Sequence, residues 1–183
     1  MGRNVEIKAR IESVELLLPR VTAISDRGPF EIDQDDTFFV CPNGRLKLRE
    51  VSPSRGELIF YERRDSAGPK ESFYVLSPTS SPDSLRDLLS LACGQAGRVR
   101  KHRTLFLTGR TRLHLDRVEG LGDFLELEVV LEENEPAEEG ARVAEELLEN
   151  LGIHRSQLVE GAYVDLLGGT GEAKRNAREE RLM

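Results

Sequence analysis

Most of the chain alternates between apolar and polar residues with a period of two, the pattern of a β-strand with one buried face. In residues 4–11, Val5, Ile7 and Ala9 fall on one face, while Glu6 and Lys8 fall on the other. The same alternation predicts strands over residues 38–41, 44–49, 58–64, 70–76, 99–107, 110–116 and 124–131. Seven or eight strands is close to the number at which an antiparallel sheet closes on itself.

Three segments replace this alternation with helical spacing. Residues 13–23 carry apolar side chains at that spacing, with Pro19 inside the segment. Residues 81–93 begin with the Ser-Pro-Asp order that opens many helices and end before Gly94, and residues 136–151 begin with proline and end before Gly152. The predicted fold class is therefore α+β, with helices beside a sheet.

The length of 183 residues favours one domain over two. We assign residues 1–168 to this domain and expect residues 169–183 to form a flexible C-terminal tail, since their glycines and mixed charges cannot supply a core. Residues 168–171 (GGTG) superficially resemble a phosphate loop, but the Gly-Lys-Ser/Thr ending of that motif is missing.

Composition narrows the class of protein. With 38% hydrophobic and 32% charged residues the chain is globular, which excludes collagens, coiled-coil rods and integral membrane proteins. The net charge of -7 argues against a general nucleic-acid binder. Cys41 and Cys93 lie far apart and match neither a disulfide framework nor a metal motif, so we expect a reducing, cytoplasmic location. We therefore expect neither nucleic acid nor a membrane as a partner, and a homodimer is a further expectation.

Basic residues are concentrated on single faces of the predicted strands. Arg45, Lys47 and Arg49 share one face of a strand, and Lys101 and Arg103 share a face of another. Because like charges repel across a sheet, each group needs an anion nearby or open water. Periodicity alone leaves both options open, since a solvated strand face shows the same alternation as a charged channel.

Acidic residues follow the same alternation. Glu126 and Glu128 flank Leu127 and so leave one face of their strand, and Glu6 and Asp116 occupy comparable positions. Clustered carboxylates hold hard divalent cations such as Mg²⁺ or Mn²⁺. If the acidic and basic sets both point into a closed barrel, they form a channel suited to a polyphosphate.

Several ordered strings resemble the CYTH family, also called triphosphate tunnel metalloenzymes. They are residues 4–8 (NVEIK), 34–39 (QDDTFF), 44–50 (GRLKLRE), 58–63 (LIFYER) and 114–128 (HLDRVEGLGDFLELE). The closest likeness is to the bacterial class IV adenylyl cyclase branch. The resemblance implies an eight-stranded closed antiparallel β-barrel, the triphosphate tunnel, with peripheral helices.

The resemblance also implies roles for individual residues. The implied metal ligands are Glu6, Asp116, Glu126 and Glu128, and the implied cofactor is Mg²⁺ or Mn²⁺. The implied phosphate-binding residues are Lys8, Arg45, Lys47, Arg49, Arg63, Lys70, Lys101, Arg103 and Arg112. Asp116, Lys8 and Arg112 are the residues expected to act in catalysis. Asn4 stands where the family signature usually has an acid, which leaves the number of metal ions open, although an amide can still offer its carbonyl oxygen.

The implied activity is conversion of ATP to cyclic AMP and pyrophosphate. One alternative uses the same tunnel to hydrolyse inorganic triphosphate or an organic triphosphate such as thiamine triphosphate. A second alternative is a non-catalytic nucleotide- or polyphosphate-binding protein, which Asn4 motivates.

Some smaller signals have two interpretations. Tyr61, Ser72 and Tyr74 alternate with apolar residues, which favours packing over contact with a base or ribose. His114 lies on the Asp116 side of its strand, either as an acid or base or as a polar partner of a nearby carboxylate.

Overall fold

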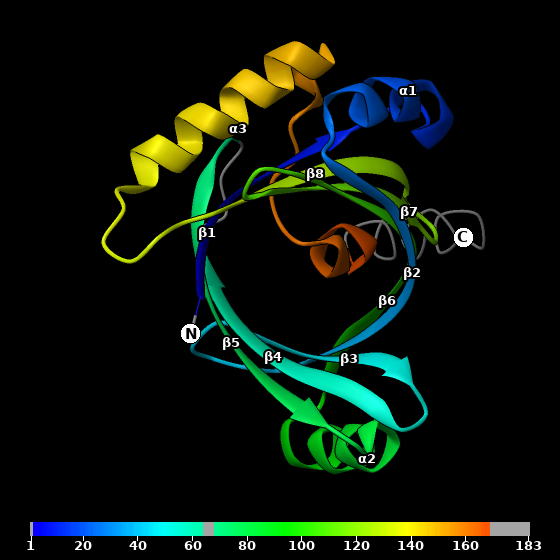
Figure 1. Cartoon of the computed structure of the whole chain (residues 1–183). Coiled ribbons are helices and arrows are strands. Elements are labelled where there is room, and N and C mark those ends of the chain that lie inside the picture. Colours follow the sequence, from blue (N-terminus) through cyan, green and yellow to red (C-terminus); the bar gives the residue numbers. More distant parts are fainter. Residues whose placement is uncertain (1, 64–67, 169–183) are drawn as a thin grey trace, which may run out of the picture.

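The strands close into one barrel. The computed structural model describes residues 2–63 and 68–168. All neighbouring strands are antiparallel, in the order β1-β5-β4-β3-β2-β6-β7-β8, which confirms the predicted barrel (Figure 1). The strands are β1 (Gly2–Arg10), β2 (Arg27–Phe39), β3 (Arg45–Ser52), β4 (Arg55–Arg63), β5 (Lys70–Thr79), β6 (Gln95–Thr108), β7 (Thr111–Val118) and β8 (Gly122–Val130). Strand β1 completes the ring, because Glu6 lies opposite Glu128 on one side and opposite Lys70 on the other.

In the part of the chain that the structure describes, three α-helices lie outside the barrel, as predicted. They are α1 (Val14–Ile24), α2 (Pro82–Cys93) and α3 (Ala137–Leu151). Pro19 is accommodated inside α1, and Gly152 ends α3 with the positive φ of 70° that glycine adopts without strain. Figure 1 shows α1 and α3 above the strands β1, β7 and β8, while α2 lies at the opposite side of the ring, against β2, β3 and β4.

The main apolar core lies between the barrel wall and the helices α1 and α3. Val5 and Ile7 on β1, each 1% exposed, belong to one cluster with residues of α1 and α3 such as Val21 and Leu148. Each side chain of this size contributes about 1.5–3 kcal/mol when fully buried. Because side chains alternate across a strand, packing these residues outward turns Glu6 on the same strand into the barrel.

The chain returns to one end of the barrel after α3. A single turn of 3-10 helix, η1 (Arg155–Gln157), precedes an isolated bridge between Ala9 and Leu158. Residues 163–168 are helical, and Tyr163 packs in a second buried cluster with Phe38 and Phe124. In Figure 1 this segment lies within the ring of strands. It therefore covers one end of the barrel interior.

The prediction of a short strand over residues 38–41 was wrong, because β2 spans thirteen residues. Residues 33–36 carry polar side chains on both faces: Gln34 and Asp36 point inward, while Asp33 and Asp35 lie on the other face. A segment that is polar on both faces has no apolar alternation to reveal it. The predicted tail and nearly all of the GGTG segment fall outside the described residues.

Within the part of the chain that the structure describes, every helix is too short or too polar to span a lipid bilayer.

Candidate functional site

The barrel encloses a cavity of about 380 Å³ lined by side chains from all eight strands. Its lining includes seven basic residues, Lys8, Lys47, Arg49, Arg63, Lys101, Arg103 and Arg112. It also includes five acidic residues, Glu6, Asp36, Glu57, Glu126 and Glu128. The charged faces therefore point into the barrel instead of into open water. The excess of cations makes this interior attractive to a polyanion.

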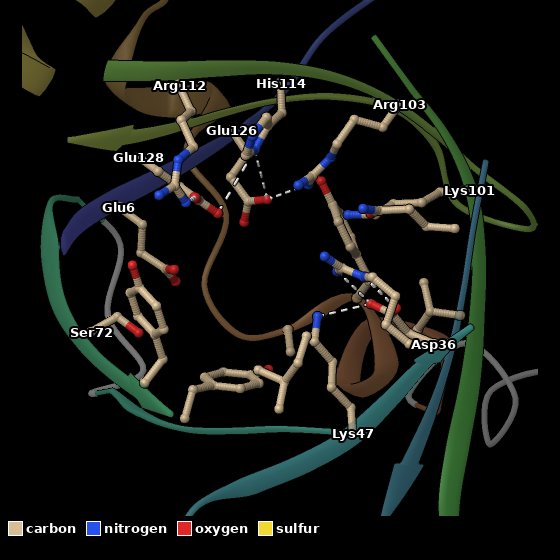
Figure 2. A pocket seen from close by; sticks show the side chains of 18 of the residues that line it. Glu6, Asp36, Lys47, Ser72, Lys101, Arg103, Arg112, His114, Glu126 and Glu128 are labelled. Carbon is tan, nitrogen blue, oxygen red and sulfur yellow. Dashed lines mark hydrogen bonds and ion pairs between the residues drawn. The ribbon is translucent and has the colours of Figure 1, made fainter. Parts of the chain in front are cut away.

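The carboxylates of Glu6, Glu126 and Glu128 form what we call the acidic wall. Glu6 on β1 is directly opposite Glu128 on β8, and His114 on β7 is directly opposite Glu126 (Figure 2). The Nδ1 atom of His114 lies 3.7 Å from Oε2 of Glu126 and 3.8 Å from Oε1 of Glu128. One donor atom from each of these three residues lies within 4.8 Å of the others, so the group could hold a metal ion.

Basic residues keep the acidic wall ionised. Burial alone would raise the pKa of Glu126, but Lys8, His114 and Arg103 outweigh burial and hold that pKa well below its usual value. The pKa of Glu128 is also lowered, against burial, chiefly by His114 and Arg103. Burial lowers the pKa of His114, which favours the neutral imidazole. The wall therefore offers anionic oxygens from Glu126 and Glu128 beside the imidazole of His114.

We call Lys47 and Arg49 on β3, with Lys101 and Arg103 on β6, the basic wall. Asp36 on β2 lies between these strands, 2% exposed, and accepts hydrogen bonds from Lys47 at 2.8 Å and from Arg49 at 2.8 and 2.9 Å (Figure 2). Burial opposes ionisation of Asp36, but Lys47 and Arg49 lower its pKa strongly. Asp36 thus fixes two cations in position with charge-assisted bonds.

Asp116 plays the same part for the other half of the basic wall. Arg103 donates to both of its oxygens, at 2.6 and 2.7 Å, and Lys101 donates to Oδ2 at 2.9 Å. The hydroxyl of Tyr163 donates to Oδ2 as well, at 2.9 Å. Asp116 is fully buried and is not among the residues that line the cavity. The structure therefore places this predicted metal ligand against cations. Arg103 lies between Asp116 and Glu126, and its Nη2 atom also donates a hydrogen bond to Oε2 of Glu126 at 2.7 Å.

Burial affects the two lysines of the basic wall in the same direction. It lowers the pKa of Lys101 to about 8, with a further decrease from the neighbouring Arg103 charge that Asp116 only partly offsets. Burial and Arg49 also lower the pKa of Lys47. An anionic ligand beside either ammonium group would favour its protonated form.

The remaining predicted cations fall into two groups. Lys8, Arg63 and Arg112 line the cavity next to the acidic wall: Lys8 lies 3.5 Å from Glu126, Arg63 pairs with Glu6, and Arg112 donates to Glu128 at 3.0 Å. Arg45 and Lys70 are not among the lining residues. Arg45 donates to Asp165 at 2.7 Å, and Lys70 is buried opposite Glu6 on β5.

A third part of the lining is largely apolar. Ile59 and Tyr61 on β4 are directly opposite Leu76 and Tyr74 on β5, and all four line the cavity. We call these four residues the apolar wall. Ser72 lines the cavity beside it. Because Tyr61 and Tyr74 line the cavity, they could contact the base or ribose of a ligand, which is the interpretation that the sequence favoured less than packing.

Sequence reasoning missed the roles of Asp36 and Tyr163. Asp36 shares the inner face of β2 with Gln34 and Phe38. A predicted strand that included residues 34–38 would have placed Asp36 on the same face as Phe38. Besides its hydrogen bond to Asp116, Tyr163 contacts two cations with its ring. The Nζ atoms of Lys8 and Lys101 lie 3.9 Å and 4.9 Å from the ring centre. No spacing in the sequence connects Tyr163 with those residues, because the C-terminal segment reaches the barrel only in three dimensions.

The fold and the cavity together define the triphosphate tunnel class of barrel. Residues 2–163 match the CYTH domain. The chain therefore belongs to the CYTH domain family, whose members are adenylyl cyclases or triphosphatases that use divalent metals.

Individual relatives are distant. The adenylate cyclase CyaB of Aeromonas hydrophila is 23% identical over 168 residues, which are 87% of this chain and 86% of that protein. The PH1012 protein of Pyrococcus horikoshii has a similar structure, with a TM-score of 0.79 and 23% identity over 89% of this chain and 98% of that one. HpAC1 of Hippeastrum, described with a dominant triphosphatase activity, has a TM-score of 0.58 and 17% identity over 84% of this chain and 89% of that one.

Proposed function

We propose that this protein binds the triphosphate of ATP in the tunnel and converts ATP to cyclic AMP and pyrophosphate. The observation that carries the proposal is the division of one cavity into acidic, basic and apolar walls. A triphosphate needs several fixed cations, which the basic wall supplies. A nucleoside needs an apolar surface, which Tyr61 and Tyr74 supply and which inorganic triphosphate would not use.

The acidic wall fits a divalent metal. Glu6, Glu126 and Glu128 would hold it, and the buried carbonyl oxygen of Asn4, which has no hydrogen-bond partner in the described structure, is a further donor on the same side of β1. A bound Mg²⁺ or Mn²⁺ supplies Lewis-acid chemistry and offsets the repulsion between carboxylates and phosphate.

The protein's own residues then orient the reaction. Lys47, Arg49, Lys101 and Arg103 hold the phosphates of the leaving group, while Lys8 and Arg112 contact the transferring phosphate beside the acidic wall. The ribose 3'-hydroxyl releases its proton to solvent, and its oxygen forms a bond to the α phosphorus as the bond from that phosphorus to pyrophosphate breaks. Such catalysis depends on positioning and charge stabilisation more than on covalent chemistry.

We assign Asp116 a positioning role within this scheme. Its two oxygens already accept bonds from Arg103, Lys101 and Tyr163, so binding a metal would require it to release at least one of them. Holding Arg103 and Lys101 toward the cavity is the task that its geometry supports.

The second candidate function is hydrolysis of a triphosphate at its terminal phosphorus. HpAC1, which shares the fold, is described with a dominant triphosphatase activity. The acidic and basic walls would serve either reaction. The two differ in whether the metal-bound region lies next to the α or the terminal phosphorus, and in whether the apolar wall is occupied.

Product analysis separates these functions. Purified protein is incubated with Mg²⁺ or Mn²⁺ and either ATP or inorganic triphosphate, and the products are resolved by ion-exchange chromatography. Equimolar cyclic AMP and pyrophosphate from ATP are expected. Orthophosphate from inorganic triphosphate, without cyclic AMP from ATP, would move the assignment to the hydrolase. Tight binding without any turnover would favour a non-catalytic binding protein. A Glu126→Gln/Glu128→Gln protein purified in parallel controls for contaminating activity.

A further inference from the structure

His114 is a buried polar residue whose ring nitrogen lacks a hydrogen-bond partner. The residue is 3% exposed, and Nδ1 makes no hydrogen bond within the described structure. Buried polar atoms are nearly always paired, so an unpaired one calls for a specific explanation. Here the atom points between Glu126 and Glu128, at 3.7 and 3.8 Å, which is beyond hydrogen-bond distance (Figure 2).

These two nitrogen–oxygen distances fit three ligands of one metal ion better than a direct hydrogen bond between His114 and either carboxylate. Two donor atoms that each lie about 2.0–2.2 Å from a metal ion are held about 3–4 Å apart from each other. The His114 nitrogen lies at that spacing from both carboxylate oxygens, at 3.7 and 3.8 Å, and one donor atom from each of the three residues lies within 4.8 Å of the others on the adjacent strands β7 and β8. The three side chains could therefore bind one ion, although the Glu126 oxygen nearest His114 also accepts a hydrogen bond from Arg103 at 2.7 Å.

Asn4 is a second, independent reason to expect a nitrogen ligand at the acidic wall. Its amide oxygen is neutral, so the acidic wall has one anionic oxygen fewer than a wall with an acid at that position would have. A carboxylate-rich site favours Mg²⁺, whereas replacing oxygen donors with an imidazole nitrogen favours transition metals. The composition of this wall is therefore shifted away from a purely oxygen-donating site.

We propose that His114 is a direct metal ligand, together with Glu126 and Glu128, and that its nitrogen gives the site a preference for Mn²⁺ over Mg²⁺. This inference rests on the proposed function only in placing a metal at the acidic wall. The rival role for His114 is structural, as a neutral side chain that spaces Glu126 from Glu128.

Mn²⁺ alone is the probe, because its electron spin reports directly bound nitrogen. Pulsed electron paramagnetic resonance of the full-length protein with Mn²⁺ is expected to show hyperfine coupling to one imidazole ¹⁴N. The coupling should disappear in His114→Gln and persist in His102→Gln, the matched control, since His102 is a surface residue paired with Glu31 and Asp33. A structural role for His114 would give no coupling even in the unmodified protein, and this result would overturn the proposal without reliance on any variant.

Metal affinity gives a second readout. Titration calorimetry is expected to show the dissociation constant for Mn²⁺ increasing by about tenfold or more in His114→Gln, because losing a ligand costs at least as much as losing its outer-shell support. The constant for Mg²⁺ should change by less than about threefold, since Mg²⁺ gains little from nitrogen. Equal losses for both ions would overturn the proposed preference.

The outcome is separable from the proposed function. Nitrogen coupling with no turnover of ATP or inorganic triphosphate would retain the metal ligand and reject the enzyme assignment. Turnover without nitrogen coupling would retain the enzyme and reject His114 as a ligand.

Discussion

The acidic and basic walls of the tunnel bury similar numbers of charges but satisfy them differently. In the basic wall, Asp36 and Asp116 each accept several short bonds from the cations around them. In the acidic wall, the ring nitrogen of His114 and the amide oxygen of Asn4 are buried without hydrogen-bond partners among the described residues. The carboxylates of the acidic wall are paired with Lys8, Arg63, Arg103 and Arg112, so the two walls differ in these two unpaired polar atoms, which the proposed metal ion would satisfy.

The sharpest test of this contrast removes the charge of the acidic wall. Changing Glu126 and Glu128 together to Gln keeps their shape and removes two of the proposed metal-binding anions. We expect turnover to fall by about a thousandfold or more, because charge stabilisation by a bound metal is worth several kcal/mol. Steady-state kinetics with Mg²⁺ and with Mn²⁺ measure the effect, and an unchanged circular dichroism spectrum shows that the barrel still forms.

The matched change in the basic wall should have a different signature. Lys47→Ala and Arg49→Ala remove two of the proposed phosphate contacts and leave the acidic wall unchanged, so KM for the triphosphate should rise while Mn²⁺ affinity stays the same. Full activity of the Gln double variant, or loss of Mn²⁺ binding in the Ala variants, would show that the two walls do not divide the work in this way.

The same contrast explains what the sequence could and could not predict. Alternation identified β1, β7 and β8, because Val5, Leu113 and Leu127 pack outward against helices. It failed for the part of β2 before residue 38, whose inner face supplies Asp36. Asp33 and Asp35 make the outer face of that segment polar as well, so neither face carries the apolar signal that reveals β1, β7 and β8. The charged sets of the two walls were predicted from clustering and family resemblance, whereas the pairing within each wall required the register between strands.

Breaking the pairing of the basic wall should reduce stability. Asp36→Asn leaves Lys47 and Arg49 without their counter-ion, and we expect the free energy of unfolding to fall by about 3–5 kcal/mol. Asp35→Asn is the control: Asp35 pairs with Arg98 and Arg100 at a more exposed position, where a loss of about 1 kcal/mol or less is expected. Urea titration at constant salt measures both losses, and equal losses would contradict the special status of Asp36.

The contribution of Asp36 to the free energy of unfolding should also decrease as the pH falls. Its pKa is lowered on folding, so its contribution to stability is complete above the ordinary pKa of about 4 and is lost as the pH falls toward the folded value. The difference between the unmodified protein and Asp36→Asn should therefore shrink in acid. A difference that stays constant from pH 7 to pH 3 would exclude this ion-pair explanation.

A smaller effect tests whether the basic wall is charged when it meets its ligand. Lys101 has a pKa of about 8 in the free protein because burial and Arg103 disfavour its charge. A triphosphate favours the protonated ammonium, so binding above pH 8 requires uptake of a proton and becomes weaker as the pH rises. We expect the dissociation constant for inorganic triphosphate to be up to about tenfold higher at pH 9 than at pH 7, since one proton is worth a factor of ten per pH unit.

Calorimetry in buffers of different ionisation enthalpy measures both the affinity and the proton uptake. Lys101→Arg keeps its charge throughout this range and should lose the proton uptake, which separates Lys101 from the ionisation of the ligand itself. If the uptake persists in Lys101→Arg, another group titrates, such as Lys47 or the ligand, and Lys101 is already charged before the ligand arrives.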